Sequence, residues 1–120
     1  MAEAARKKGS VIYHNPRCST SRKTLQLLRD NGVEPTVLEY LKTPPTRAQL
    51  ATLIRDAGIE VRAAVRPKEA PYAELNLAGA GDDELLDAMV AHPILIDRPF
   101  VVTAKGTRLA RPFDAVREIL

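Results

Sequence analysis

The sequence predicts an α/β fold built on a mixed four-stranded sheet, and three observations support this. A run of β-branched and aromatic residues, 11–13, is followed by a helical pattern from Arg22 and by a second strand-like run, 36–40. A strand, a helix and a second strand joined by short loops favour parallel pairing of the two strands through a right-handed crossover. Two later apolar runs, 100–103 and 107–110, flank a glycine-containing turn, which is typical of an antiparallel hairpin. Helical patterns lie between the two halves, so helices are expected on the faces of the sheet.

Composition favours an ordinary globular protein. The chain has 120 residues, enough for one domain with a modest core, and 45% of them are hydrophobic and 28% charged. The net charge of +3 permits an acidic ligand. Nucleic-acid binding usually shows a clustered basic face with aromatic residues, and only 4% of this chain is aromatic, so no nucleic-acid partner is predicted.

The chain shows no targeting or membrane signal. Residues 1–9 carry basic side chains without the apolar core of a signal peptide, so we expect a disordered N-terminal arm before a single domain at 10–120. No stretch approaches the roughly 20 apolar residues of a membrane span, so no membrane partner is expected. The single cysteine cannot form an internal disulfide, which favours a reducing, cytoplasmic location. Any redox cycle must therefore take its second thiol from another molecule.

Three helices can be placed from periodicity and end signals. The first runs to about Asn31, where Asn31-Gly32 is a typical stop. Thr46 and Gln49 have the spacing of a capping box, and the helix after them ends at Gly58. Its apolar residues follow the clearest helical period in the chain: Leu50, Leu53, Ile54 and Ala57. A final helix is predicted over 113–120.

The segment between the second helix and the hairpin is less regular. A short helical piece is expected at 60–65, ending before Arg66-Pro67. Residues 71–80 are predicted to form a connector with one turn at 72–75. Asp82 is predicted to cap a further helix that His92-Pro93 closes.

The chemically distinctive residue is Cys18, which follows the first strand and precedes the first helix. The three residues after it are good helix N-caps: Ser19, Thr20 and Ser21. Backbone N–H groups at a helix N-terminus lack intrahelical partners and carry the positive end of the helix dipole. Both a thiolate and an incoming oxyanion are stabilised there.

Basic neighbours favour the same ionised form. His14, Arg17 and Arg22 can each place positive charge near the sulfur. A free cysteine has a pKa of about 8.5, so only roughly 3% is thiolate at neutral pH, whereas a pKa about two units lower would make most of it thiolate. The alternative is that Cys18 is a small buried hydrophobe. A polar, basic and cap-rich setting favours a reactive thiol instead, and no metal site is predicted.

Three further arginines stand out because each directly precedes a proline: Arg66, Arg98 and Arg111. Each lies at the end of a predicted element. Singly, they fit surface arginines on loops. Together they could converge on a tetrahedral oxyanion, whose geometry suits the guanidinium fork better than a lysine. The spacing alone leaves both interpretations open.

Five segments together carry a family resemblance: IYHNPRCSTSRKTLQLL, LEYLKTPPTRAQL, VRAAVRPKEAPYAEL, AHPILIDRPFVVT and GTRLARPFDAVREIL. In this order, and over essentially residues 10–120, the chain resembles the glutaredoxin-coupled arsenate reductases, the ArsC family. The HNPxCxTSR and ILIxRPxVVT segments are the most specific. The resemblance implies a thioredoxin-like three-layer fold, an α/β architecture in which a mixed four-stranded sheet carries an inserted helical region.

The resemblance also implies roles for individual residues. Cys18 would be the nucleophile that attacks arsenate, and His14 would lie near it and help to hold the thiolate. Pro99 falls where thioredoxin-like folds place a cis proline that faces the active cysteine. Arginines corresponding to the family's oxyanion-binding residues are Arg66, Arg98 and Arg111. The surrounding loop would be supported by Asn15, Ser19, Thr20, Ser21 and Arg22.

The implied reaction starts when arsenate or a similar oxyanion docks at the helix N-terminus and is attacked by the Cys18 thiolate, with loss of water. Glutathione then adds as a co-substrate, glutaredoxin reduces the mixed species, and arsenite is released. No tightly bound cofactor is implied. The chain departs from the family loop at Arg17, where a small residue is common, and at Ser19, where glycine is common.

Two other functions remain open from the sequence. A monothiol glutathione-dependent oxidoreductase acting on mixed disulfides would need Cys18 and a glutathione site, but not all three arginines. A transcriptional regulator of the Spx type would share the fold. Such regulators typically carry a Cys-x-x-Cys switch, and here the second position is Ser21.

Overall fold

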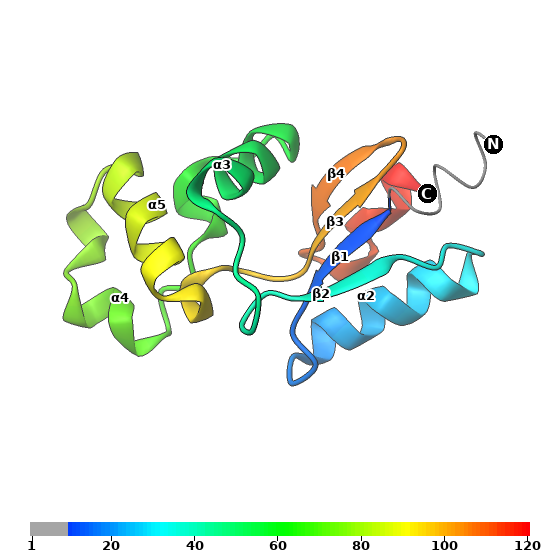
Figure 1. Ribbon diagram of the computed structural model, residues 1–120, viewed down its shortest axis with the longest axis horizontal. Helices are drawn as coiled ribbons and strands as arrows, with labels where there is room; N and C mark the ends of the chain where they lie inside the picture. Colours follow the sequence, from blue (N-terminus) through cyan, green and yellow to red (C-terminus); the bar gives the residue numbers. More distant parts are fainter. Residues whose placement is uncertain (1–9) are drawn as a thin grey trace. The chain divides into compact units, whose positions relative to one another are not determined.

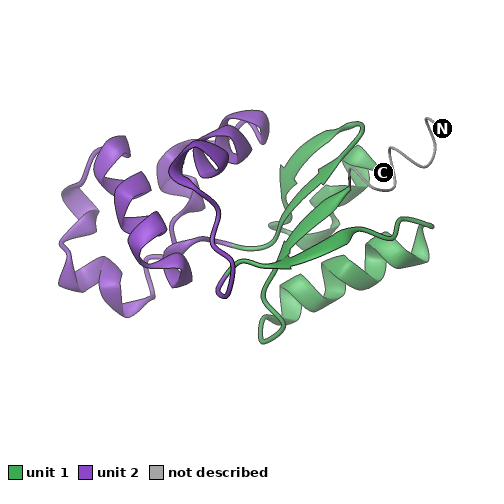
Figure 2. Cartoon of the chain, in the orientation of Figure 1, with its two compact units in different colours: residues 1–40, 98–120 green, residues 41–97 purple. Residues whose placement is uncertain are grey.

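The structure, a computed structural model, describes residues 10–120. The predicted N-terminal arm, residues 1–9, lies outside the described residues. The chain divides into two compact units (Figure 2). The sheet unit contains the chain up to Tyr40 together with Arg98–Leu120, and the helical unit contains Leu41–Asp97. The prediction that 10–120 behave as a single domain stays a prediction.

The sheet unit is built on four short strands in the order β2-β1-β3-β4 (Figure 1). Their bounds are Val11–His14 for β1, Thr36–Glu39 for β2, Phe100–Thr103 for β3 and Gly106–Leu109 for β4. β1 pairs with β2 in parallel and with β3 antiparallel, and β3 and β4 form the antiparallel hairpin. The predicted α/β fold with a mixed four-stranded sheet is therefore confirmed.

The core of the sheet unit lies between the strands and two helices that contact each other, α2 (Ser19–Asp30) and η4 (Phe113–Ile119). Ile12 of β1 stands opposite Val101 of β3, and both are fully buried. They join a cluster completed by Leu27, Leu28, Ala110, Val116 and Ile119. Side chains alternate along a strand, so His14 lies on the same face as Ile12, and this alternation brings its ring under the start of α2.

The last helix is tighter than an α-helix. η4 is a 3₁₀-helix over Phe113–Ile119, with i→i+3 backbone bonds such as Ala115 N to Pro112 O at 3.0 Å and Leu120 N to Arg117 O at 3.3 Å. The predicted helix is thus present, with a 3₁₀ winding that the apolar spacing did not indicate.

The helical unit contains α3 (Arg47–Asp56) and α5 (Asp82–Ala91). Shorter pieces connect them and lead back to the sheet: η1 (Val61–Ala64), α4 (Ala70–Glu74), η2 (Leu77–Gly79) and η3 (Pro93–Leu95). The predicted capping box is present, because Gln49 N donates to Thr46 Oγ1 at 3.1 Å and Thr46 N donates to Gln49 Oε1 at 2.9 Å.

Two details of this unit correct the sequence predictions. Gly81, rather than Asp82, is the N-cap of α5, since its extended backbone leads into the helix and its carbonyl accepts from Leu85 N at 3.0 Å. Asp82 instead lies in the first turn, where an acidic side chain stabilises the helix dipole. The connector holds two helical pieces rather than one turn. Arg62 supports them by donating to Leu77 O at 3.2 Å and Ala80 O at 2.6 Å.

Within residues 10–120, none of the helices combines the length and the apolar character that crossing a bilayer would require.

Candidate active site

The loop before Cys18 is fixed by Asn15. Cys18 N donates to Asn15 O and Arg17 N donates to Asn15 Oδ1, both at 3.0 Å. Arg22 N donates to Cys18 O at 3.0 Å, which is the first bond of α2. Cys18 itself is therefore the N-cap, with an extended backbone and no side-chain capping bond. The three hydroxyl residues after it, which the sequence suggested as caps, lie inside the first helical turn.

Ser21 connects the loop to the first strand. Its side chain is fully buried, and its Oγ accepts from Asn15 N at 3.1 Å. The same oxygen lies 2.7 Å from His14 Nδ1. Burial is the main cause that lowers the pKa of His14, the Glu39 charge opposes it, and the charges of Arg29 and Arg22 add to the lowering. The lowered pKa favours the neutral ring of His14, and the 2.7 Å contact pairs its Nδ1 with Ser21 Oγ.

The half-buried Cys18 thiol has a pKa below its ordinary value. Burial alone raises the pKa, but hydrogen bonds from Ser21 N–H, the Arg98 side chain and Thr20 N–H, together with the positive charge of Arg111, lower it further than burial raises it. The direction agrees with the expectation for a helix N-terminus. The cations responsible are Arg98 and Arg111, which corrects the expectation that His14, Arg17 and Arg22 would supply that charge.

The Arg111 guanidinium contacts the sulfur of Cys18 directly. Its Nη2 lies 3.6 Å from Cys18 Sγ, and its Nη1 lies 3.5 Å from Thr20 Oγ1. Its Nε donates to Arg98 O at 2.9 Å, which ties the segment after β4 to the segment before β3. Arg98 is 8% exposed and Arg111 is exposed, so two of the three predicted arginines meet at the thiol, one buried and one at the surface.

Both arginines precede cis prolines. The Arg98–Pro99 bond is cis, as the resemblance implied for Pro99. The Arg111–Pro112 bond is also cis, which the sequence did not indicate.

The third arginine belongs to the helical unit and has acidic partners there. Arg66 Nη1 donates to Asp97 Oδ1 at 2.9 Å, and its Nε lies 3.4 Å from Glu69 Oε2. Burial lowers the pKa of Arg66, but these two carboxylates more than compensate and raise it. Arg66 N also donates to Leu95 O at 2.7 Å. The participation of Arg66 in oxyanion binding stays a prediction.

The sequence did not indicate which residues Ser21 contacts. Ser21 was named as a cap and a loop residue, whereas it supports both Asn15 and His14. Strand alternation, which turns His14 toward the first turn of α2, is the signal that could have indicated this pair. The described residues contain no group of three or more His, Cys, Asp or Glu side chains that could hold a metal ion.

Comparison with known proteins now places this site in a family, since the model of the ArsC family matches residues 13–119. The chain belongs to the ArsC family. Similar curated proteins include "Arsenate reductase" of Rhizobium meliloti (strain 1021), 59% identical over 112 residues, which cover 92% of this chain and 80% of that protein. "Arsenate reductase" of Escherichia coli (strain K12) is 58% identical over 112 residues, or 92% of this chain and 79% of that protein.

A solved structure supports the same assignment. "Arsenate reductase from Vibrio cholerae" superposes with a TM-score of 0.88 at 49% identity, covering 92% of this chain and 97% of that chain. The family suggested by the sequence segments is therefore confirmed, together with its α/β fold.

Proposed function

We propose that this ArsC protein is an arsenate reductase that converts arsenate to arsenite through a covalent adduct between Cys18 and arsenic. The observation that carries the proposal is the position of the thiol: Cys18 is the N-cap of α2, and Arg111 Nη2 lies 3.6 Å from its Sγ. In keeping with this, two helix N–H groups and two arginines lower the pKa of the thiol. The same groups that stabilise a thiolate also suit a tetrahedral oxyanion next to it. The names of relatives at 58% and 59% identity point to the same substrate.

The first chemical step follows from this geometry. The Cys18 thiolate attacks arsenic and forms a sulfur–arsenic bond, while one arsenate oxygen takes up protons and leaves as water. Arg111 and Arg98 are placed to compensate the negative charge around the sulfur, with Arg66 as the proposed third oxyanion ligand. Asp97 and Glu69 hold the Arg66 guanidinium through Nη1 and Nε, and we infer that its Nη2 is the donor for an oxyanion.

The electron balance calls for a second thiol. Reduction of As(V) to As(III) takes two electrons, which two thiols supply when they become one disulfide. The chain has one cysteine, so the second thiol belongs to another molecule. We infer that glutathione supplies it as co-substrate and that glutaredoxin regenerates the enzyme, in keeping with a reducing cytoplasm.

The test is arsenate-dependent NADPH oxidation in the presence of glutathione, glutaredoxin and glutathione reductase. We expect turnover by the wild-type protein, none by Cys18→Ser, and a strong reduction in Arg98→Ala. Arg117→Ala, which removes an exposed arginine near the end of η4, controls for the loss of one positive charge and should retain turnover.

One result would overturn the proposal. If the wild-type protein shows no arsenate-dependent turnover while Cys18 still reacts rapidly with a thiol reagent at pH 6, the protein is better described as a monothiol oxidoreductase acting on mixed disulfides.

A further inference from the structure

Arg17 is an exposed cation next to Cys18 that the reaction at the sulfur does not use. Its backbone is held by the bond from its N–H to Asn15 Oδ1 at 3.0 Å. Across residues 10–120, its guanidinium has no hydrogen-bond or ion-pair partner. It is also not among the groups that shift the pKa of Cys18. A charge in this position is therefore available to a molecule that approaches the thiol from solvent.

The other exposed charges that follow Arg17 on the same segment are positive, while the acidic Glu39 stands opposite His14 where β1 pairs with β2. Arg22 lies one turn into α2, and its Nη1 donates to Pro16 O at 2.8 Å, which holds its guanidinium over the loop that carries Arg17. Lys23 is exposed beside it and lies 5.9 Å from the centre of the Phe113 ring. The segment 10–29 contains no acidic residue. Three residues after Arg111 in the chain, Asp114 is an exposed acidic residue in the first turn of η4. The exposed cations of this segment are Arg17, Arg22 and Lys23, and we call these three residues the cationic rim.

This rim differs from the arginines that contact the sulfur. Arg98 is largely buried, and Arg111 is engaged with Thr20 and with the Arg98 carbonyl. Those two act on the thiolate and on an oxyanion attached to it. Arg17, by contrast, is exposed, lies next to Cys18 in the chain, and has a guanidinium with no hydrogen-bond or ion-pair partner among the described residues.

We propose that Arg17 determines the charge preference of the site for its thiol co-substrate, by pairing with a carboxylate of an anionic thiol such as glutathione. The proposal rests on the proposed function, which requires an external thiol, and adds the residue that selects it. Glutathione carries two carboxylates and one ammonium group. A guanidinium fork pairs bidentately with a carboxylate, and an exposed pair of this kind is sensitive to salt.

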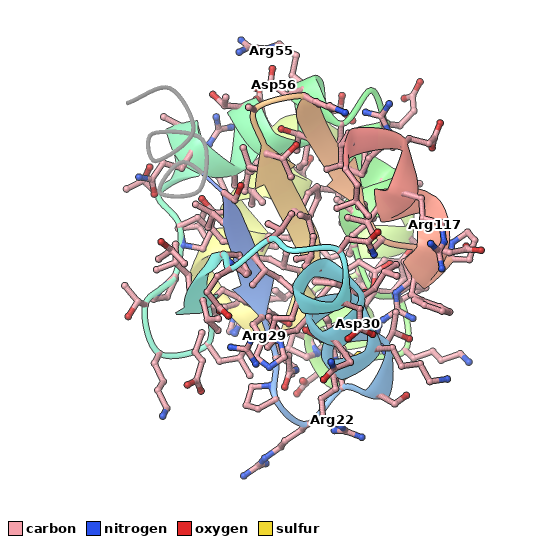
Figure 3. All side chains as sticks on the ribbon, turned by 90° about the vertical axis from the view of Figure 1, so that its right-hand side faces the viewer. Arg22, Arg29, Asp30, Arg55, Asp56 and Arg117 are labelled. Atoms are coloured by element: carbon pink, nitrogen blue, oxygen red, sulfur yellow. The ribbon has the colours of Figure 1, made fainter. Side chains whose placement is uncertain are left out.

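Thiol–disulfide exchange tests this without arsenate. The Cys18 thiolate attacks one sulfur of an added disulfide, a new disulfide to Cys18 forms, and the other half leaves as a thiolate. Three disulfides provide a charge series: oxidised glutathione is anionic, bis(2-hydroxyethyl) disulfide is neutral and cystamine is cationic. Their rates with Cys18 are compared in wild type, Arg17→Ala and Arg117→Ala. Arg117 is exposed and lies well apart from Arg22 in Figure 3, so Arg117→Ala controls for the loss of one positive charge elsewhere on the surface.

We expect Arg17→Ala to react with oxidised glutathione about two- to fivefold more slowly than wild type, the range that an exposed ion pair gives. The rate with the neutral disulfide should be unchanged, and the rate with cystamine should be unchanged or higher. The difference should shrink in 0.5 M NaCl because the pair is exposed. Arg117→Ala should behave as wild type with all three disulfides.

Two outcomes would overturn the inference. Equal slowing with all three disulfides would mean that Arg17 acts on the thiolate or the loop. No slowing with oxidised glutathione would mean that it does not recognise the thiol. Failure of the proposed function is seen separately, as absence of arsenate turnover by a wild-type protein that still discriminates among the disulfides.

Discussion

At the scale of single residues, the site depends on charge placed beside one sulfur. The Arg111 guanidinium is 3.6 Å from Cys18 Sγ, and its positive charge is one of the causes that lower the pKa of the thiol. Removing the Arg111 charge while leaving the helix N-terminus in place should separate the effect of Arg111 on the pKa of Cys18 from the effect of the helix N–H groups. The thiolate reactivity of Cys18 as a function of pH reports on them directly.

We predict that Arg111→Ala raises the pKa of Cys18. A lowered pKa keeps the thiolate present as pH falls, so losing a stabilising cation moves the midpoint of reactivity upward, toward the value of about 8.5 for a free thiol. The measurement is the rate of alkylation by iodoacetamide between pH 5 and 9. Arg117→Ala should leave the midpoint in place. An unchanged midpoint in Arg111→Ala would mean that the helix N–H groups and Arg98 suffice.

Ser21 offers a second prediction at this scale. Ser21→Ala leaves Asn15 N and His14 Nδ1 without the oxygen that both use, in a fully buried position. An unsatisfied buried polar group costs about 1–3 kcal/mol, and we expect a loss of this size in the free energy of unfolding measured with urea. Ser19→Ala, at an exposed position of the same helical turn, should change it by less than about 0.5 kcal/mol. Equal effects of the two substitutions would contradict this account of Ser21.

At the scale of elements, local signals predicted most of the structure. The two halves of the sheet and α3 follow from periodicity and turn residues. Leu50, Leu53 and Ile54 of α3 are buried as expected, whereas Ala57, the C-cap, is only partly buried. The helical content of the connector at 71–80 is greater than the sequence predicts, because contacts with Arg62 support it. Arg62 donates to the hydroxyl of Tyr72, ten residues later in the chain, at 3.0 Å. A left-handed residue that is not glycine, Asn76, separates α4 from η2. Neither feature has a periodic signature in the sequence.

The capping box of α3 gives a prediction for an element. Thr46→Ala removes the side chain that accepts from Gln49 N, so the helix start loses one of its partners. We expect the free energy of unfolding to fall by about 1 kcal/mol. Thr43→Ala, three residues earlier in an exposed turn, is the control and should be close to neutral. Circular dichroism during urea unfolding measures both, and identical curves for Thr46→Ala and wild type would show that the cap contributes nothing.

At the scale of the whole molecule, the site joins residues that are far apart in the chain. Cys18 follows β1, Arg98 precedes β3 and Arg111 follows β4, and the sheet order places β3 beside β1 and β4. The pairing of strands therefore explains how these residues meet. Sequence could nominate the residues, through Arg-Pro steps and family resemblance. It could not reveal the Arg111–Arg98 backbone contact or the support from Ser21, because these depend on tertiary packing.

Asp97 carries the last prediction, because it pairs with Arg66 and directly precedes Arg98 in the chain. Under the proposed role of Arg66 in oxyanion binding, Asp97 is a positioning residue that orients the guanidinium. Asp97→Asn removes the charge of a 2.9 Å pair whose two side chains are 24% and 19% exposed. We expect KM for arsenate to rise about fivefold, equivalent to ~1 kcal/mol, with kcat and the pH midpoint of Cys18 alkylation little changed.

Glu69→Gln provides the comparison, because Glu69 contacts the same guanidinium at the longer distance of 3.4 Å. Its effect on KM should be smaller than that of Asp97→Asn. A fall in kcat with KM unchanged, or a raised alkylation midpoint, would indicate that Asp97 acts on the Cys18 thiolate instead. The split between KM and kcat therefore decides whether the carboxylate of Asp97 serves binding of the oxyanion or activation of the nucleophile.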